Sequence, residues 1–171
     1  MELLYIVIAL ALMALVIAKA KNQKGQETQN YSYSRKAALF TPAERSFLGV
    51  MELAMGDEVK IFGKVRVADV ITPKGRMSRS NWQRAFNKIS AKHFDFVLCD
   101  KKYLSIICVV ELDDSSHQRA SRKRRDAFLV GACASADIPL IQVSAKATYS
   151  VADVQKLLLP YITSISTVET T

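Results

Sequence analysis

Three acidic residues lie near the ends of two consecutive extended segments. Asp95 interrupts an apolar segment, while Glu111 and Asp113 close the apolar run of residues 104–112. Side chains alternate along a strand, so Glu111 and Asp113 should share one face. A tight turn at residues 100–102 would pair the two segments as a hairpin and bring Asp95 opposite or next to Glu111. We therefore expect three carboxylates at one end of a sheet.

Carboxylates this close repel one another and resist burial unless a cation neutralises them. Mg²⁺ or Mn²⁺ suits oxygen ligands and keeps bound waters for chemistry, so Asp95, Glu111 and Asp113 are the candidate metal ligands. Such an ion stabilises charge on a phosphoryl oxygen, which favours phosphodiester hydrolysis. His117 follows closely and could act as an acid, a base or a ligand. Five cations occupy the seven positions 119–125, and Arg125 is assigned to the phosphate charge.

A second basic stretch points to an anionic partner. The net charge is +8, and residues 60–92 hold nine Lys or Arg residues against the single acid Asp69. Phosphate contacts give affinity independent of sequence, and stacking on Trp82 would suit a single strand or an opened end. An anionic lipid surface is the alternative partner for this stretch. The candidate nucleic-acid-binding residues are Lys74, Arg76, Arg79, Trp82, Arg84, Arg122, Lys123 and Arg124.

A series of predicted helices and strands would position these residues. Thr41 as N-cap, Pro42 in the first turn and Glu44 three residues after the cap predict a helix start. Hydrophobic patterns predict further helices over 82–89, within 115–136 and over 151–161, and strands within 59–70 and over 94–99, 104–112 and 138–143. This order indicates an α/β fold with a mixed sheet.

The N-terminal sequence predicts a transmembrane anchor. Residues 3–18 form an unbroken apolar run of about 24 Å as a helix, with membrane contact expected over residues 3–20. A cleaved signal peptide is the main alternative, but the first two residues carry no positive charge. Lys19, Lys21 and Lys24 follow the run, so the positive-inside rule predicts a single-pass inner-membrane protein with its domain in the cytoplasm.

Length and composition limit the remaining architecture. The 171 residues, 50% of them hydrophobic, suit one ordinary folded domain. Three cysteines without a C-x-x-C spacing argue against a disulfide framework or a Cys-rich zinc site, and we interpret them as small buried hydrophobes. The expected organisation is an anchor over 1–21, a flexible linker over 22–37, an α/β domain over 38–162 and a polar tail over 163–171.

Four short motifs resemble one uncharacterised bacterial domain family. They are T-P-A-E-R at 41–45, F-D-F-V-L at 94–98, V-E-L-D-D-S-S-H at 110–117 and R-R-D at 124–126. The family is similar to very-short-patch-repair-like nucleases of the PD-(D/E)XK superfamily. This resemblance implies a restriction-endonuclease-like αβββαβ core and a nuclease domain over 38–162.

The resemblance also implies roles for individual residues. Asp95 would be the motif Asp, Glu111 the motif Glu, and Glu44 the acid of the first helix. The chain departs from the superfamily at position 113, where Asp113 replaces the usual lysine. The role of that lysine would then pass to Lys123, Arg125 or His117, or the site would be inactive.

The leading prediction is a membrane-anchored, Mg²⁺-dependent phosphodiesterase acting on DNA. The second is a non-catalytic nucleic-acid-binding or assembly module on the same scaffold, which the aspartate at position 113 favours. The third is a membrane-surface interaction protein whose cations contact lipid.

Overall fold

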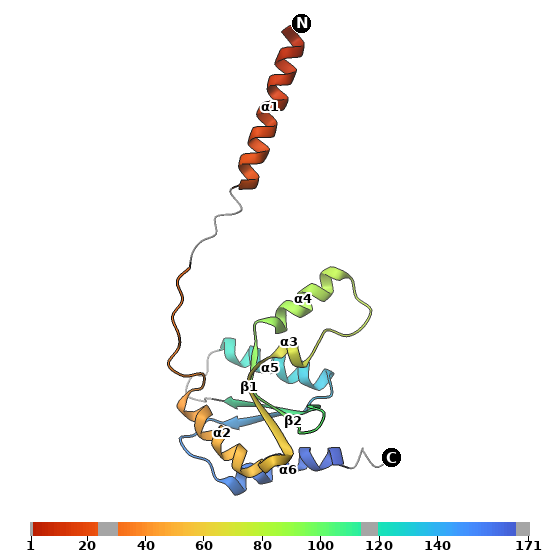
Figure 1. The fold of residues 1–171 in the computed structure, drawn as a ribbon. Helices are drawn as coiled ribbons and strands as arrows, with labels where there is room; N and C mark the ends of the chain where they lie inside the picture. Colours follow the sequence, from red (N-terminus) through yellow and green to blue (C-terminus); the bar gives the residue numbers. More distant parts are fainter. Residues whose placement is uncertain (1, 24–30, 114–119, 167–171) are drawn as a thin grey trace. The chain divides into compact units, whose positions relative to one another are not determined.

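The structure, a computed structural model, describes residues 2–23, 31–113 and 120–166. The chain divides into two units, Met1–Ala37 and Ala38–Thr171. The first unit contains helix α1 (Glu2–Gln23), and the second contains the sheet and the remaining helices (Figure 1).

The predicted transmembrane anchor over residues 1–21 is wrong. Within the described residues, none of the helices combines the length and the apolar character needed to cross a membrane. The reason is the limited length of the apolar run, since 16 residues span about 24 Å while the hydrocarbon core is about 30 Å thick. The last turns of α1 instead contain Lys19, Lys21 and two amide residues. The single-pass inner-membrane location and the orientation toward the cytoplasm, both of which depended on this anchor, are corrected with it, whereas membrane contact of residues 3–20 stays a prediction.

The second unit is built on a four-stranded mixed sheet. Its strands are β1 (Val59–Arg66), β2 (His93–Asp100), β3 (Ile106–Asp113) and β4 (Leu140–Ser144), and they lie in the order β1-β2-β3-β4. The first three strands are antiparallel neighbours, whereas β4 runs parallel to β3. The structure is therefore a mixed α/β fold.

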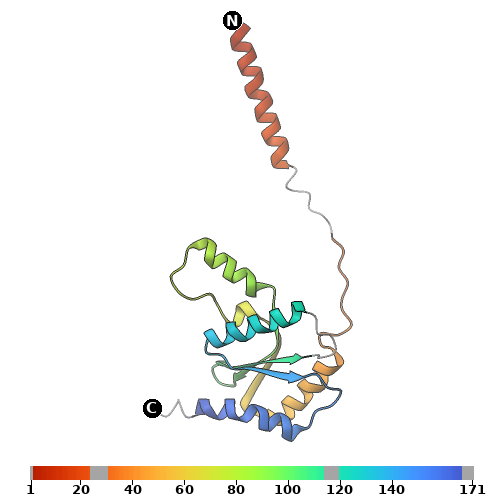
Figure 2. The same cartoon turned by 180° about the vertical axis from the view of Figure 1, so that it is seen from behind.

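Helices cover both faces of this sheet (Figure 2). One core cluster joins α2 (Pro42–Met55) and α6 (Val151–Ser166) to the sheet. The other joins α3 (Val67–Val70), α4 (Arg79–Ser90) and α5 (Ala120–Ser135) to the opposite face. A short 3₁₀ turn, η1, links α2 to β1 over Gly56–Glu58. Because both faces are covered, the central strands are apolar almost throughout.

The three cysteines lie within this interior, as predicted. Cys99, Cys108 and Cys133 are all buried and free. Burial, together with the nearby Cys99, raises the pKa of Cys108 to about 12. Such a thiol remains protonated and packs as a small apolar group.

The predicted helix start at Thr41 is confirmed. The Thr41 hydroxyl accepts a hydrogen bond from the Glu44 backbone N–H at 3.3 Å, and Glu44 Oε2 accepts from the Thr41 N–H at 2.9 Å. This reciprocal capping box holds the first turn of α2 beside the sheet. Phe40, just before the cap, stacks on Phe96 of β2 with ring centroids 5.5 Å apart.

Gly63 of β1 allows Phe40 to approach the sheet. A Cβ added at position 63 would lie 2.2 Å from Phe40 Cζ. Gly63→Ala is therefore expected to displace the ring and lower the free energy of unfolding by about 1–3 kcal/mol, measured by urea denaturation. Gly49→Ala is the matched control, because that exposed position of α2 has nothing within 4 Å. The control should stabilise the helix by up to about 1 kcal/mol, so equal losses in both variants would contradict this role for Gly63.

Candidate functional site

The hairpin of β2 and β3 has the predicted register. Phe96 pairs with Val110 and Val97 with Val109, so the continuing register sets Asp95 next to Glu111. The backbone N–H of Leu112 donates to Asp95 Oδ2 at 3.0 Å, which fixes the Asp95 carboxylate against the end of β3.

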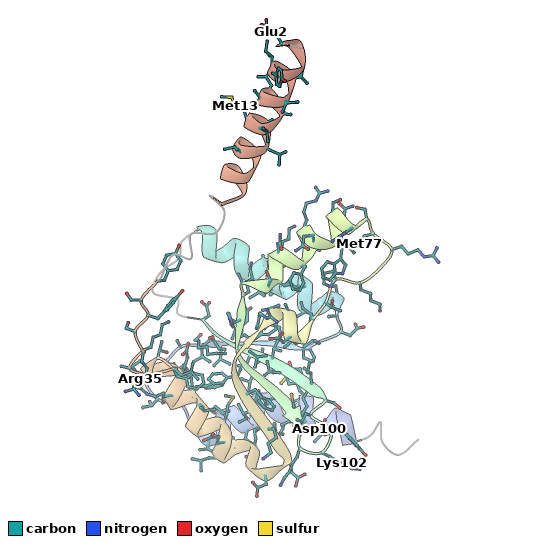
Figure 3. All side chains as sticks on the ribbon, turned by 45° about the horizontal axis from the view of Figure 1, so that its top comes forward. Glu2, Met13, Arg35, Met77, Asp100 and Lys102 are labelled. Carbon is teal, nitrogen blue, oxygen red and sulfur yellow. The ribbon has the colours of Figure 1, made fainter. Side chains whose placement is uncertain are left out.

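The turn at the other end of this hairpin also agrees with the prediction. Asp100 Oδ1 accepts hydrogen bonds from the backbone N–H groups of Lys102 at 2.9 Å and Tyr103 at 2.6 Å. Asp100 and Lys102 are labelled in Figure 3 at this turn. The turn closes the hairpin, and the register then shifts between Leu98 and Cys99 to the one that brings Asp95 and Glu111 together.

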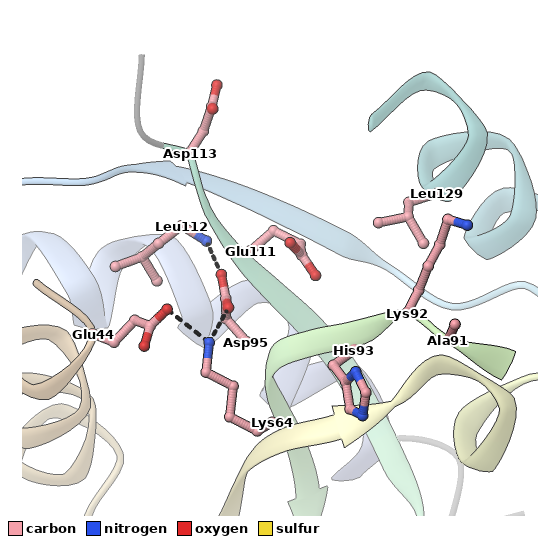
Figure 4. Close-up of a pocket in the computed structure, with 10 residues that line it drawn as sticks. All are labelled: Glu44, Lys64, Ala91, Lys92, His93, Asp95, Glu111, Leu112, Asp113 and Leu129. Atoms are coloured by element: carbon pink, nitrogen blue, oxygen red, sulfur yellow. Dashed lines mark hydrogen bonds and ion pairs between the residues drawn. The ribbon is translucent and has the colours of Figure 1, made fainter. Parts of the chain in front are cut away.

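A pocket of about 430 Å³ lies at the acidic end of the hairpin. All four acids predicted for the site line it, from α2, β2 and β3 (Figure 4). Cationic and imidazole side chains from β1, from the residue before β2 and from the first residue of β2 share the same walls. Its charged and polar lining residues are Glu44, Lys64, Lys92, His93, Asp95, Glu111 and Asp113.

Lys64 joins two of these acids. Its Nζ lies 2.7 Å from Glu44 Oε1 and 2.8 Å from Asp95 Oδ1. The side chains of Glu44 and Asp95 are only 11% and 16% exposed, so water screens these ion pairs incompletely. Glu44 and Asp95, which lie 20 and 31 positions from Lys64 in the sequence, thus meet around its ammonium group.

The ion pairs outweigh the cost of burial. Burial by itself opposes ionisation of Glu44, but the hydrogen bonds and charge of Lys64, with hydrogen bonds from Thr41, lower the pKa of the Glu44 carboxyl. Burial likewise opposes the charge on Lys64, while Asp95 and Glu44 raise the pKa of its ammonium group. Both groups are therefore charged at neutral pH.

Lys64 was not singled out from the sequence, where it counted only as one cation of the basic stretch. It lies opposite Asp95, between the pairs Gly63–Phe96 and Val65–Phe94. Its backbone has φ 56°, a left-handed conformation that costs a non-glycine residue about 1–2 kcal/mol. The Gly-Lys pair inside an apolar strand was the available signal, because glycine there often marks a close approach or an irregular strand.

The three predicted metal ligands do not form one cluster. Asp95 points toward Lys64, whereas Asp113 points away from Asp95 at the exposed end of β3 (Figure 4). Among the side chains that the structure describes, no group of three or more His, Cys, Asp or Glu residues is arranged to hold a metal ion. The acids that remain adjacent in the hairpin register are Asp95 and Glu111.

Asp95 and Glu111 still suit a magnesium ion by their chemistry. Both offer carboxylate oxygens in the same pocket, and Mg²⁺ commonly binds through only one or two carboxylates plus waters and a substrate phosphate. Glu111 also lies near the buried Cys133 of α5. Burial, with the charge of Glu111, raises the pKa of Cys133 to about 11.

The remaining predicted residues fall into two groups. His117 lies outside the described residues, and so do the side chains of Arg122, Lys123, Arg124 and Arg125, although α5 includes their backbone. By contrast, Lys74, Arg76, Arg79, Trp82 and Arg84 are exposed on α4 and on the loop before it.

One family model matches the chain. It is described as "Protein of unknown function (DUF2726)" and covers residues 36–160. No curated protein and no solved structure matches the chain. The matched range includes all the described residues that line the acidic pocket. The family description states no activity, so a function must be argued from the pocket.

Proposed function

This chain belongs to the DUF2726 family of proteins of unknown function, and we propose that its acidic pocket is the active site of a Mg²⁺-dependent phosphodiesterase acting on DNA. One observation supports this most strongly. Two adjacent carboxylates, Asp95 and Glu111, share a single cavity with the cations Lys64 and Lys92. A phosphodiester is an anion, so a pocket that is to hold it beside carboxylates needs positive charge as well.

Each residue of the pocket would have its own role in hydrolysis. Asp95 and Glu111 would hold the metal ion, which when bound supplies positive charge to the phosphoryl oxygens. Lys64 and the Leu112 N–H fix the two oxygens of Asp95 in place. Lysine has three N–H donors, and the contacts with Glu44 and Asp95 use two of them, which leaves the third for a phosphate oxygen. His93 lines the pocket and offers an imidazole that can accept or donate a proton.

The resemblance to very-short-patch-repair-like nucleases adds support. The three acids to which it assigns roles, Glu44, Asp95 and Glu111, line the same pocket although they come from three different elements. Lys64 would take the role of the lysine that position 113 lacks. It would approach the acids from β1 rather than from β3.

Nicking of supercoiled plasmid by the purified full chain tests the proposal. We expect nicked product with Mg²⁺ or Mn²⁺ and none when EDTA removes the metal, because the two carboxylates alone repel the phosphate. Calorimetry of Mg²⁺ binding to wild type and to Asp95→Asn gives an independent readout. Absence of nicking with either metal would overturn the hydrolase proposal.

A non-catalytic DNA-binding module is the second candidate. It is favoured by the ion pairs themselves, because Lys64 already compensates Glu44 and Asp95 without a metal ion. Salt-sensitive DNA binding that is unaffected by EDTA, without nicking, is the result expected of such a module.

A further inference from the structure

A second cavity lies beside the acidic pocket and has a different character. Its volume is about 920 Å³, and it is formed by α4, α5 and the loop that follows α3. Met77, labelled in Figure 3, belongs to that loop. We propose that this groove binds single-stranded nucleic acid and leads the strand into the acidic pocket. The proposal rests on the proposed function and specifies the form of its substrate.

The floor of the groove is apolar. Ile71 and Ile89 are buried at its base, and Phe128 and Ala132 of α5 form the facing wall. Nucleobases stack on aromatic side chains irrespective of sequence, and Phe128 offers an aromatic ring at this wall. In a duplex the bases are stacked inside the helix, so only a strand with exposed bases could use this floor.

The rim of the groove is positively charged. Lys74, Arg84 and Lys88 line it, and no acidic residue is found among the described side chains that do so. Arg84 is held by its hydrogen bond to Asn81 Oδ1 at 2.7 Å, which keeps the guanidinium at the groove. Cations above an apolar floor complement a strand whose phosphates lie outside its bases.

The groove and the acidic pocket are lined by residues that are neighbours in the chain. Ile89 and Phe128 line the groove, while Lys92, three residues after Ile89, and Leu129, the residue after Phe128, line the acidic pocket. Lys92 Nζ lies 5.2 Å from the centre of the Phe128 ring, in a cation–π contact at the boundary. A strand seated in the groove would pass Lys92 to reach the pocket that Asp95 and Glu111 line.

Fluorescence anisotropy with the full chain in EDTA tests this inference without any cleavage. The probes are a labelled oligothymidine, a duplex of the same length and poly-glutamate. We expect the single strand to bind at least about 10-fold more tightly than the duplex and not to be displaced by poly-glutamate. Equal binding of the duplex, or displacement by the acidic peptide, would overturn the proposal.

Variants locate the binding to the groove. Arg84→Ala with Lys88→Ala should weaken single-strand binding about 10-fold and reduce its salt dependence by about 1.4 in the log–log slope, since two phosphate contacts are lost. Lys60→Ala with Lys101→Ala, two exposed lysines outside the groove, is the control that removes the same charge. Equal losses in both double variants would overturn the assignment.

Phe128→Leu tests the apolar floor at constant charge. It should weaken binding of the single strand while leaving the salt slope unchanged. Plasmid nicking by wild type separates the two proposals. Nicking without single-strand preference would overturn only the groove, and groove binding without nicking would overturn only the hydrolase.

Discussion

Glu111→Gln is expected to lower the rate of Mg²⁺-dependent plasmid nicking by at least about 100-fold. Loss of groups that merely orient metal ligands costs about 10- to 100-fold, and Glu111 is proposed to hold the ion itself. Glutamine keeps the size of the side chain but removes the anionic oxygen that a hard cation requires. Initial nicking rates at equal salt and saturating Mg²⁺ measure the effect.

Glu52→Gln provides the matched control for this substitution. Glu52 lies on α2, is exposed and does not line the acidic pocket. Its substitution by glutamine therefore removes the same charge at a site away from the pocket. We expect nicking within about twofold of wild type, as for a distant surface charge screened by salt. If Glu111→Gln cleaved as fast as this control, the assignment of the active site to the pocket would be wrong.

Lys64→Met is expected to have the second largest effect, on both activity and stability. Methionine fills much of the same space but leaves Glu44 and Asp95 without their shared cation. Nicking should fall about 10- to 100-fold, because Asp95 loses the group that orients it. The free energy of unfolding at neutral pH should fall by about 1–2 kcal/mol, a modest loss because the Lys64 side chain is 29% exposed.

The stability loss should depend on pH in a defined direction. The pKa of Glu44 is lowered from its ordinary value of 4.5, so its contribution is present above that value and is lost as pH falls through the folded-state pKa. The pKa of Lys64 is raised from 10.5, so its contribution is present below that value and is lost as pH rises through the folded-state pKa. The difference between wild type and Lys64→Met should therefore be largest in the neutral range and shrink in acid.

Urea denaturation at a series of pH values measures this dependence. Lys60→Met on the same strand is the control, because its exposed side chain does not line the pocket. A constant difference between Lys64→Met and wild type from neutral pH into acid would show that apolar packing, rather than the ion pairs, accounts for the stability loss.

Much of the local structure could be predicted from the sequence. The capping box at Thr41 and Glu44 spans four residues, and the β2–β3 hairpin follows from two apolar segments joined by a short turn. These features depend on neighbours in the chain, so residue type and spacing define them. The apolar run near the N-terminus showed the limit of such patterns, because its character suggested a membrane span that its length does not support.

The amino-acid sequence by itself determined the mixed α/β fold, the buried cysteines and the approach of Asp95 to Glu111 along one hairpin. Only the tertiary structure decided that Lys64 lies between Glu44 and Asp95, that Asp113 points away, and that an apolar groove adjoins the pocket. The physical reason is distance along the chain. Contacts between separate elements depend on how the elements pack, here with Lys64 of β1 in a left-handed backbone conformation.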